Sequence, residues 1–216
     1  MPSTSVTSCA ASTSVIARQI LRVSASICIS FGAVAAPPAP PLDFKGLALG
    51  APVTAAQVEA LLNSPCVSAA NRACDALELV IHERQKVSCG QGSQGMTVCN
   101  GAATVAGFSS EINVVIGANG LLRRVLLSGL DPDNFDAIRA ELQGKFGPPK
   151  SQQKSGVQNA YGAKFQQIES VWMDSNGGRI EFSKYAGSIE RSSLYFSTAE
   201  DRERVKATQR GTKGDL

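Results

Sequence analysis

The chain has 216 residues, with 21 Lys and Arg against 18 Asp and Glu, which gives a formal net charge of +3. Without Arg18 and Arg22, which lie in an N-terminal segment that we expect to be removed, 19 basic residues face 18 acidic ones, a net charge of +1. Such a balance argues against nucleic acid or an anionic membrane as a partner, because either would require a surface patch of one sign.

The first 35 residues have the composition of an export signal peptide. No Asp or Glu precedes Asp43, two arginines lead into an apolar run at 23–34, and Ala33-Val34-Ala35 has the small-x-small form of a cleavage site. We therefore expect cleavage between Ala35 and Ala36 and a periplasmic or secreted product. A serine-rich transit peptide is the alternative. The apolar run is too short to span a bilayer, and Cys28 lacks the flanking residues of a lipidated cysteine, so we expect no stable membrane anchor.

A proline-rich linker at 36–45 follows, because Pro37-Pro38-Ala39-Pro40-Pro41 forms a stiff extended segment. About 175 residues remain after it, enough for a single domain with a real core. We expect this domain at 46–199 and a polar C-terminal tail at 200–216, either a frayed helix or a solvated segment.

Two helices are predicted from their capping signals. The first begins after Thr54, which forms a capping box with Gln57, and ends near Asn63, before a proline. The second begins with Asp131 as its cap and Pro132 at its first position, and Gly147-Pro148-Pro149 ends it. Its apolar stripe consists of Phe135, Ile138, Leu142 and Phe146.

Each helix is followed by an Asn-Gly hairpin signal. Strands at 111–116 and 121–127 flank Asn119-Gly120, and strands at 171–174 and 179–185 flank Asn176-Gly177. A last strand at 193–198 completes the set. The predicted fold is therefore α+β, an antiparallel sheet with two helices on one face, built as tandem helix-plus-hairpin units with an insertion at 66–105 in the first unit. Within the insertion, Leu77, Leu79 and Ile81 favour a strand, with a short helix as the alternative.

The four cysteines of the insertion are predicted to form disulfides. Neighbour pairing, Cys66 with Cys74 and Cys89 with Cys99, closes the smallest loops, and two other connectivities are possible. A zinc site is the alternative, but the set contains no Cys-x-x-Cys pair. Disulfides fit the oxidising compartment that the signal peptide implies.

The segment from Gly50 to Pro65, with Thr54, Gln57-Val58 and Leu62 in place, resembles the helix motif of outer-membrane assembly lipoproteins of the SmpA/OmlA (BamE-like) type. The tandem arrangement is similar to that of the β-lactamase inhibitory protein family, and Leu142 with Phe146-Gly147-Pro148-Pro149 echoes the motif in the second unit. The chain lacks the lipidated cysteine of the lipoproteins. The resemblance implies a non-catalytic scaffold of the bacterial envelope that binds another protein, without naming the partner.

Residues that would support catalysis are few. His82 is the only histidine, no Gly-x-Ser-x-Gly elbow is present, and we predict no catalytic residue, no metal site and no cofactor. A hydrolase that uses Glu169, Asp174 and Glu181 is the enzymatic alternative.

A protein-binding face is predicted from the second hairpin. With Asn176-Gly177 as a two-residue turn, Met173 faces Ile180 toward the core, and Trp172 faces Glu181 on the outer side. Tyr185 and Tyr195 extend that outer side. We expect Trp172, Glu181, Tyr185 and Tyr195 to bind another envelope or secreted protein, with Trp172 as a core residue in the alternative interpretation. The predicted function is an exported, non-catalytic binding domain, an assembly accessory or an inhibitor; the alternative is a disulfide-stabilised structural protein. The sequence predicts no oligomeric state.

Overall fold

The computed structural model describes residues 41–63 and 86–213, which all belong to one compact unit that spans Pro37–Leu216. The expected signal peptide, the strand at Leu77–Ile81, and the cysteines Cys66 and Cys74 lie outside the described residues. No helix in the described part is both long and apolar enough to cross a membrane.

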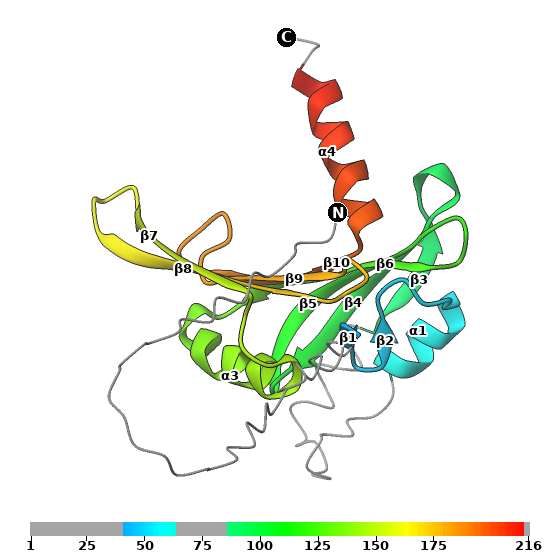
Figure 1. The fold of residues 1–216 in the computed structure, drawn as a ribbon, viewed down its shortest axis with the longest axis horizontal. Helices are drawn as coiled ribbons and strands as arrows, with labels where there is room; N and C mark the ends of the chain where they lie inside the picture. Colours follow the sequence, from blue (N-terminus) through cyan, green and yellow to red (C-terminus); the bar gives the residue numbers. More distant parts are fainter. Residues whose placement is uncertain (1–40, 64–85, 214–216) are drawn as a thin grey trace, which may run out of the picture. The chain divides into compact units, whose positions relative to one another are not determined.

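An eight-stranded antiparallel sheet dominates the fold, in the order β3-β4-β5-β6-β10-β9-β8-β7 (Figure 1). Its strands are β3 (Ser88–Gln91), β4 (Thr97–Val105), β5 (Phe108–Ile116), β6 (Leu122–Leu130), β7 (Ser151–Gln158), β8 (Lys164–Met173), β9 (Arg179–Ser183) and β10 (Ser192–Ser197). The helices α1 (Ala55–Leu62) and α3 (Phe135–Phe146) lie on one face of the sheet, and α4 (Ala199–Lys213) projects from the other (Figure 1). The predicted α+β class and the two helices on one face are confirmed.

The tandem units are larger than the sequence predicts. The first consists of α1 followed by the meander β3–β6, and the second of α3 followed by the meander β7–β10, with β6 and β10 paired at the junction. Each unit therefore has four strands where a hairpin was expected. Residues 88–105, placed in an insertion by the sequence, form β3 and β4, the counterparts of β7 and β8.

Both predicted helix starts are confirmed. At α1, the Gln57 N–H donates to Thr54 Oγ1 (3.2 Å) and the Thr54 N–H donates to Gln57 Oε1 (2.8 Å), which is the expected capping box. At the second helix, Asp131 accepts a hydrogen bond from the Asp133 N–H (2.9 Å), and a 3₁₀ turn at Pro132–Asn134 leads into α3.

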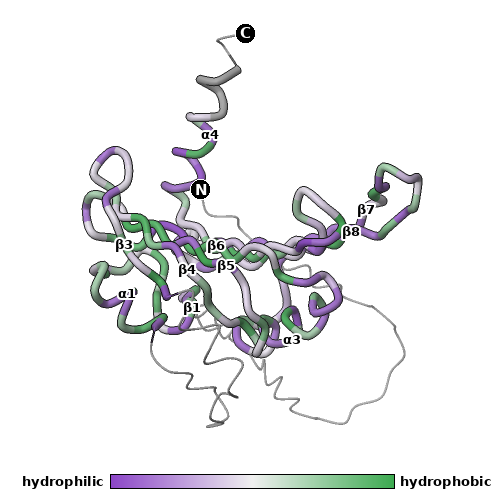
Figure 2. The backbone as a smooth tube through the Cα atoms, turned by 180° about the vertical axis from the view of Figure 1, so that it is seen from behind, coloured by the Kyte–Doolittle hydropathy of each residue, from purple (hydrophilic) through white to green (hydrophobic). Residues whose placement is uncertain are grey.

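Apolar residues of the strands and helices form one core between the sheet and the two helices. Figure 2 shows the hydrophobic residues gathered in the central strands and along the inner parts of α1 and α3. From α3, Phe135 stacks on Phe182 of β9 with ring centroids 4.3 Å apart. The predicted stripe of α3 is buried at Phe135, Ile138 and Leu142, and Phe146 packs against the edge of the core.

The expected linker ends earlier than the sequence predicts. Leu42 and Phe44 are buried, and the short hairpin of β1 (Asp43–Phe44) and β2 (Leu47–Ala48) packs on the helix side of the sheet (Figure 1). The Phe44 ring lies 5.7 Å from that of Phe196. Residues 42–45 thus belong to the domain, because apolar side chains at alternate positions follow directly after the last proline.

The strands β8 and β9 pair one residue out of the predicted register. Trp172 faces Ile180, and Val171 faces Glu181. The connection is longer than two residues, since Asp174 Oδ1 accepts hydrogen bonds from the N–H groups of Asn176 (2.9 Å) and Gly178 (2.7 Å). A shift of one residue turns every side chain of a strand to the opposite face, and this shift places Trp172 in the core.

Candidate protein-binding face

The sheet face opposite α1 and α3, here called the open face, carries two rows of paired residues that cross five strands. One row is Asn113, Leu126, Tyr195, Glu181 and Val171. The other is Val115, Arg124, Ser197, Arg179 and Met173. Because neighbouring strands lie about 4.8 Å apart, side chains in one row contact one another directly.

The open face combines aliphatic and charged side chains. Leu126 and Val171 are half-buried, and Met173 is 41% exposed. Arg179 pairs with Glu181 at 2.7 Å, and both are only partly exposed. Such a mixture of apolar side chains and partly desolvated charges occurs in non-obligate protein interfaces.

The start of α4 is fixed to the middle of the open face. The Tyr195 hydroxyl donates to Asp201 Oδ2 (2.8 Å), and Asp201 is fully buried. The Arg202 guanidinium donates to the carbonyls of Ser197 (3.0 Å) and Gly177 (2.8 Å), which ties α4 to β10 and to the β8–β9 turn. Burial of the phenol, followed by its hydrogen bond to Asp201, raises the pKa of Tyr195 to about 12.

The α4 residues of this anchor, Asp201 and Arg202, were missed in the sequence, where they belong to the expected polar tail at 200–216. One signal was present. Thr198 and Asp201 have the spacing of a helix cap, and the Asp201 N–H donates to Thr198 Oγ1 (3.2 Å). The structure therefore replaces a frayed or solvated tail with a helix whose first turn is anchored to the sheet.

The structure brings together only part of the predicted binding site. Glu181 and Tyr195 are direct partners on the open face. Tyr185 lies on the same side but near the far end of β8, where its ring contacts that of Phe165 at 5.9 Å and its backbone N–H donates to Gln167 Oε1 (2.8 Å).

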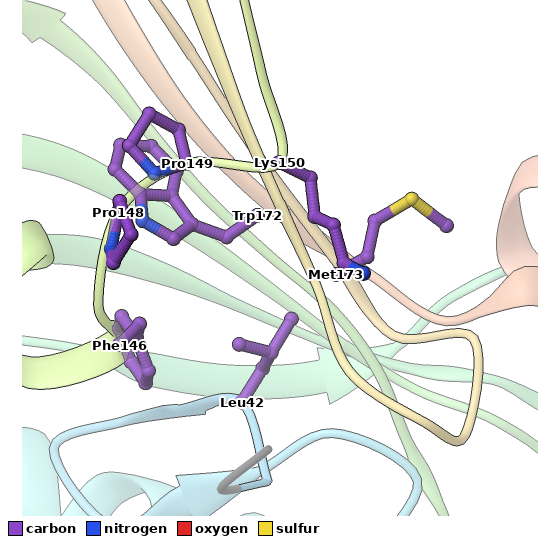
Figure 3. Close-up of a pocket in the computed structure, with 7 residues that line it drawn as sticks. All are labelled: Leu42, Phe146, Pro148, Pro149, Lys150, Trp172 and Met173. Carbon is purple, nitrogen blue, oxygen red and sulfur yellow. The ribbon is translucent and has the colours of Figure 1, made fainter. Parts of the chain in front are cut away.

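Trp172 does not belong to this face, and the prediction that it is exposed was wrong. Its side chain is only 2% exposed and its Nε1–H donates to the carbonyl oxygen of Gly147 (2.8 Å) at the end of α3. The alternative interpretation, a core tryptophan, is correct. The indole lines a cavity of about 350 Å³ together with Leu42, Phe146, Pro148, Pro149, Lys150 and Met173, and the Met173 side chain points away from it (Figure 3).

The carboxylates of the hydrolase alternative have structural contacts. Asp174 holds the β8–β9 turn, Glu181 is paired with Arg179, and Glu169 accepts a hydrogen bond from Gln167 Nε2 (3.4 Å). Among the described residues, no group of three or more His, Cys, Asp or Glu side chains is placed to hold a metal ion.

The predicted Cys89–Cys99 disulfide is confirmed, with an S–S distance of 2.02 Å. It joins directly opposed residues of β3 and β4 on the helix side of the sheet. The adjoining edge is also tied to α1, because the Cys89 N–H donates to Glu59 Oε1 (2.7 Å) and Asn63 exchanges two 2.8 Å hydrogen bonds with the Val87 backbone. The disulfide therefore ties β3 to β4, and the hydrogen bonds from Glu59 and Asn63 tie this edge of the sheet to α1.

Comparisons of the chain with protein-family models, with curated proteins and with solved structures find no match.

Proposed function

We propose that this protein is an exported, non-catalytic domain of the bacterial envelope that binds another envelope or secreted protein through its open face. The observation that carries the proposal is the set of side chains in the two rows of that face. Leu126, Val171 and Met173 are partly exposed there, on the same face as the Arg179–Glu181 ion pair. Partly accessible aliphatic side chains interspersed with charges of both signs fit a folded protein partner better than a small ligand, which requires a concave pocket.

Two further observations support export and the partner class. The Cys89–Cys99 disulfide fits an oxidising compartment, and the N-terminal segment has an arginine-flanked apolar run before Ala33-Val34-Ala35. The expected resemblance to BamE-like and inhibitor-like helix-plus-sheet modules belongs to the same proposal, with an assembly accessory and an inhibitor as its two forms. The alternative is a structural envelope protein, for which the open face would have no partner.

Crosslinking of the mature domain in envelope extract, with identification of the crosslinked protein, tests the proposal. The chain offers a matched pair of variants, since Met173 on the open face and Leu61 on α1 are both 41% exposed. Met173→Lys should abolish the specific crosslink, and Leu61→Lys should leave it intact. Loss of the crosslink with Leu61→Lys alone would move the binding site to the helix side, and absence of any specific crosslink would favour the structural alternative.

A further inference from the structure

The edge strand β7 is unusual in how little of it is covered. It pairs with β8 along all eight residues in unbroken register, from Ser151 opposite Val171 to Gln158 opposite Lys164. Seven of the eight residues are exposed, and only Val157 is half-buried. The β7–β8 hairpin extends beyond the helices that cover the sheet (Figure 1), and hydrophilic residues follow this end of it (Figure 2).

One edge of β7 presents backbone groups that β8 does not use. The Asn159 N–H donates to the Ala163 carbonyl (3.0 Å) and the Lys184 N–H to that of Ile168 (2.9 Å). Hydrogen-bonded and non-hydrogen-bonded pairs alternate along an antiparallel ladder. The odd-numbered residues of β7 therefore bond to β8, and the even-numbered ones, including Gly156, direct their N–H and C=O groups outward.

Most of the usual protection of a sheet edge is missing from β7. Proteins shield edge strands with proline, bulges, short length, charged side chains such as lysine, or a covering element. The strand β7 has no proline, no bulge and one charged residue, Lys154. The opposite edge strand, β3, has only four residues, and its Cys89 N–H is bonded to Glu59 of α1. The contrast between the two edges indicates that β7 is the edge at which a further strand can pair with the sheet.

On the side of the hairpin that carries Gly156 the charges are of one sign, whereas Glu169, opposite Gln153, lies on the other side. The chain has no Asp or Glu between Leu142 and Ile168, but it has four lysines there, Lys145, Lys150, Lys154 and Lys164. In the register of the hairpin, Lys154, Gly156 and the Gln158–Lys164 pair share one side. Of these residues, Lys154, Gly156 and Lys164 border a shallow hollow. Within the described residues neither Lys154 nor Lys164 forms a salt bridge. An acidic side chain that enters the hollow would be attracted to both ammonium groups.

We propose that β7 binds an extended acidic segment of another polypeptide, which adds to the sheet as a ninth strand. Strand addition would satisfy the outward backbone groups, and its acidic side chains would pair with Lys154 and Lys164. A second copy of β7 is disfavoured because it brings its own lysine, and like charges opposite each other destabilise a strand pair. Nucleic acid would use the lysines but not the free N–H groups. This site goes beyond the proposed function, since it shares no residue with the two rows of the open face.

The test uses a capped eight-residue peptide in which glutamate alternates with threonine and valine, titrated into the mature protein by calorimetry at low salt. Gly156→Pro removes an outward N–H while keeping the bonds to β8, and it should weaken binding about tenfold, the equivalent of roughly one to two backbone hydrogen bonds. Gly156→Ala is the matched control. It keeps the outward N–H, and a Cβ at this position meets no atom within 4 Å, so it should weaken binding less than Gly156→Pro does. The pair Lys154→Glu with Lys164→Glu should also weaken binding at least tenfold.

A second measurement keeps the test independent of the fold of the variants. The same peptide with alternate backbone nitrogens methylated should lose binding to the wild-type protein, because it cannot form the ladder. The proposal would be overturned if the wild-type protein binds no peptide, or binds the methylated peptide as tightly as the unmethylated one. It would also be overturned if Gly156→Pro binds the peptide as tightly as the wild type does. A single-stranded oligonucleotide that binds more tightly than the peptide, with an affinity that Gly156→Pro does not change, would overturn it as well. Met173→Lys should leave peptide binding unchanged, so the failure of this proposal and that of the open face are distinguishable.

Discussion

The Trp172 indole donates a 2.8 Å hydrogen bond to the carbonyl oxygen of Gly147, and this contact joins β8 to the end of α3. Gly147 has a φ of 77°, so it ends the helix in a conformation that leaves this carbonyl free for the indole. The bond makes Trp172 a packing residue between sheet and helix. It cannot also be an anchor for a partner on the open face.

Replacement of this tryptophan should therefore damage the fold and spare binding. Trp172→Ala removes a large buried side chain and should lower the free energy of unfolding by about 3 to 5 kcal/mol, measured by urea denaturation. Trp172→Phe keeps most of the volume and should cost less. A Trp172→Ala protein with wild-type stability and lost binding to the crosslinked partner would contradict the structure.

The Tyr195–Asp201 contact should make stability depend on pH in the alkaline range. Because the folded state raises the pKa of Tyr195 from 10.0 to about 12, the folded state holds this proton more tightly than the unfolded state. The stabilisation is complete below about pH 10 and declines as the pH rises toward about 12. Wild type should thus lose more stability than Tyr195→Phe between about pH 9 and pH 11.5. Parallel curves for the two proteins in urea denaturation would refute the assignment.

The disulfide that joins β3 to β4 should contribute measurably to stability. Replacing Cys89 and Cys99 together with serine should lower the free energy of unfolding by about 2 to 3 kcal/mol. The matched control is Cys66→Ser with Cys74→Ser, which leaves the β3–β4 disulfide in place. If the Cys89 and Cys99 pair of substitutions has no effect on the melting temperature, the hydrogen bonds to Glu59 and Asn63 are enough to hold this edge.

The capping box of α1 offers a local test of the helix start. Thr54→Ala removes the hydroxyl that accepts the Gln57 N–H and should cost about 1 kcal/mol in unfolding free energy. Thr54→Ser keeps the hydroxyl and should remain within a few tenths of a kcal/mol of wild type. Similar losses in both variants would indicate that the methyl group, and not the cap, matters.

Features that depend on neighbouring residues were predictable from the sequence. The starts of α1 and α3 depend on side chains that bond to backbone within three residues, so Thr54, Gln57 and Asp131 were sufficient to place them. The apolar stripe of α3 follows from helical periodicity, and the Cys89–Cys99 pair from the short loop between its members. The outward position of Tyr195 also followed, because Leu194 and Phe196 on either side of it are apolar and buried.

Features that depend on distant contacts were decided only by the tertiary structure. The strand β7 has no apolar alternation and exists because β8 offers it a complete ladder. The anchoring of α4 requires Tyr195, Ser197 and the Gly177 carbonyl, which only the folded sheet brings together. The side occupied by Trp172 depended on the length of one turn, which the hydrogen bonds of Asp174 set. Both faces of β8 carry apolar residues, so the sequence pattern alone left either register possible, and burial of the indole under α3 selected one of them.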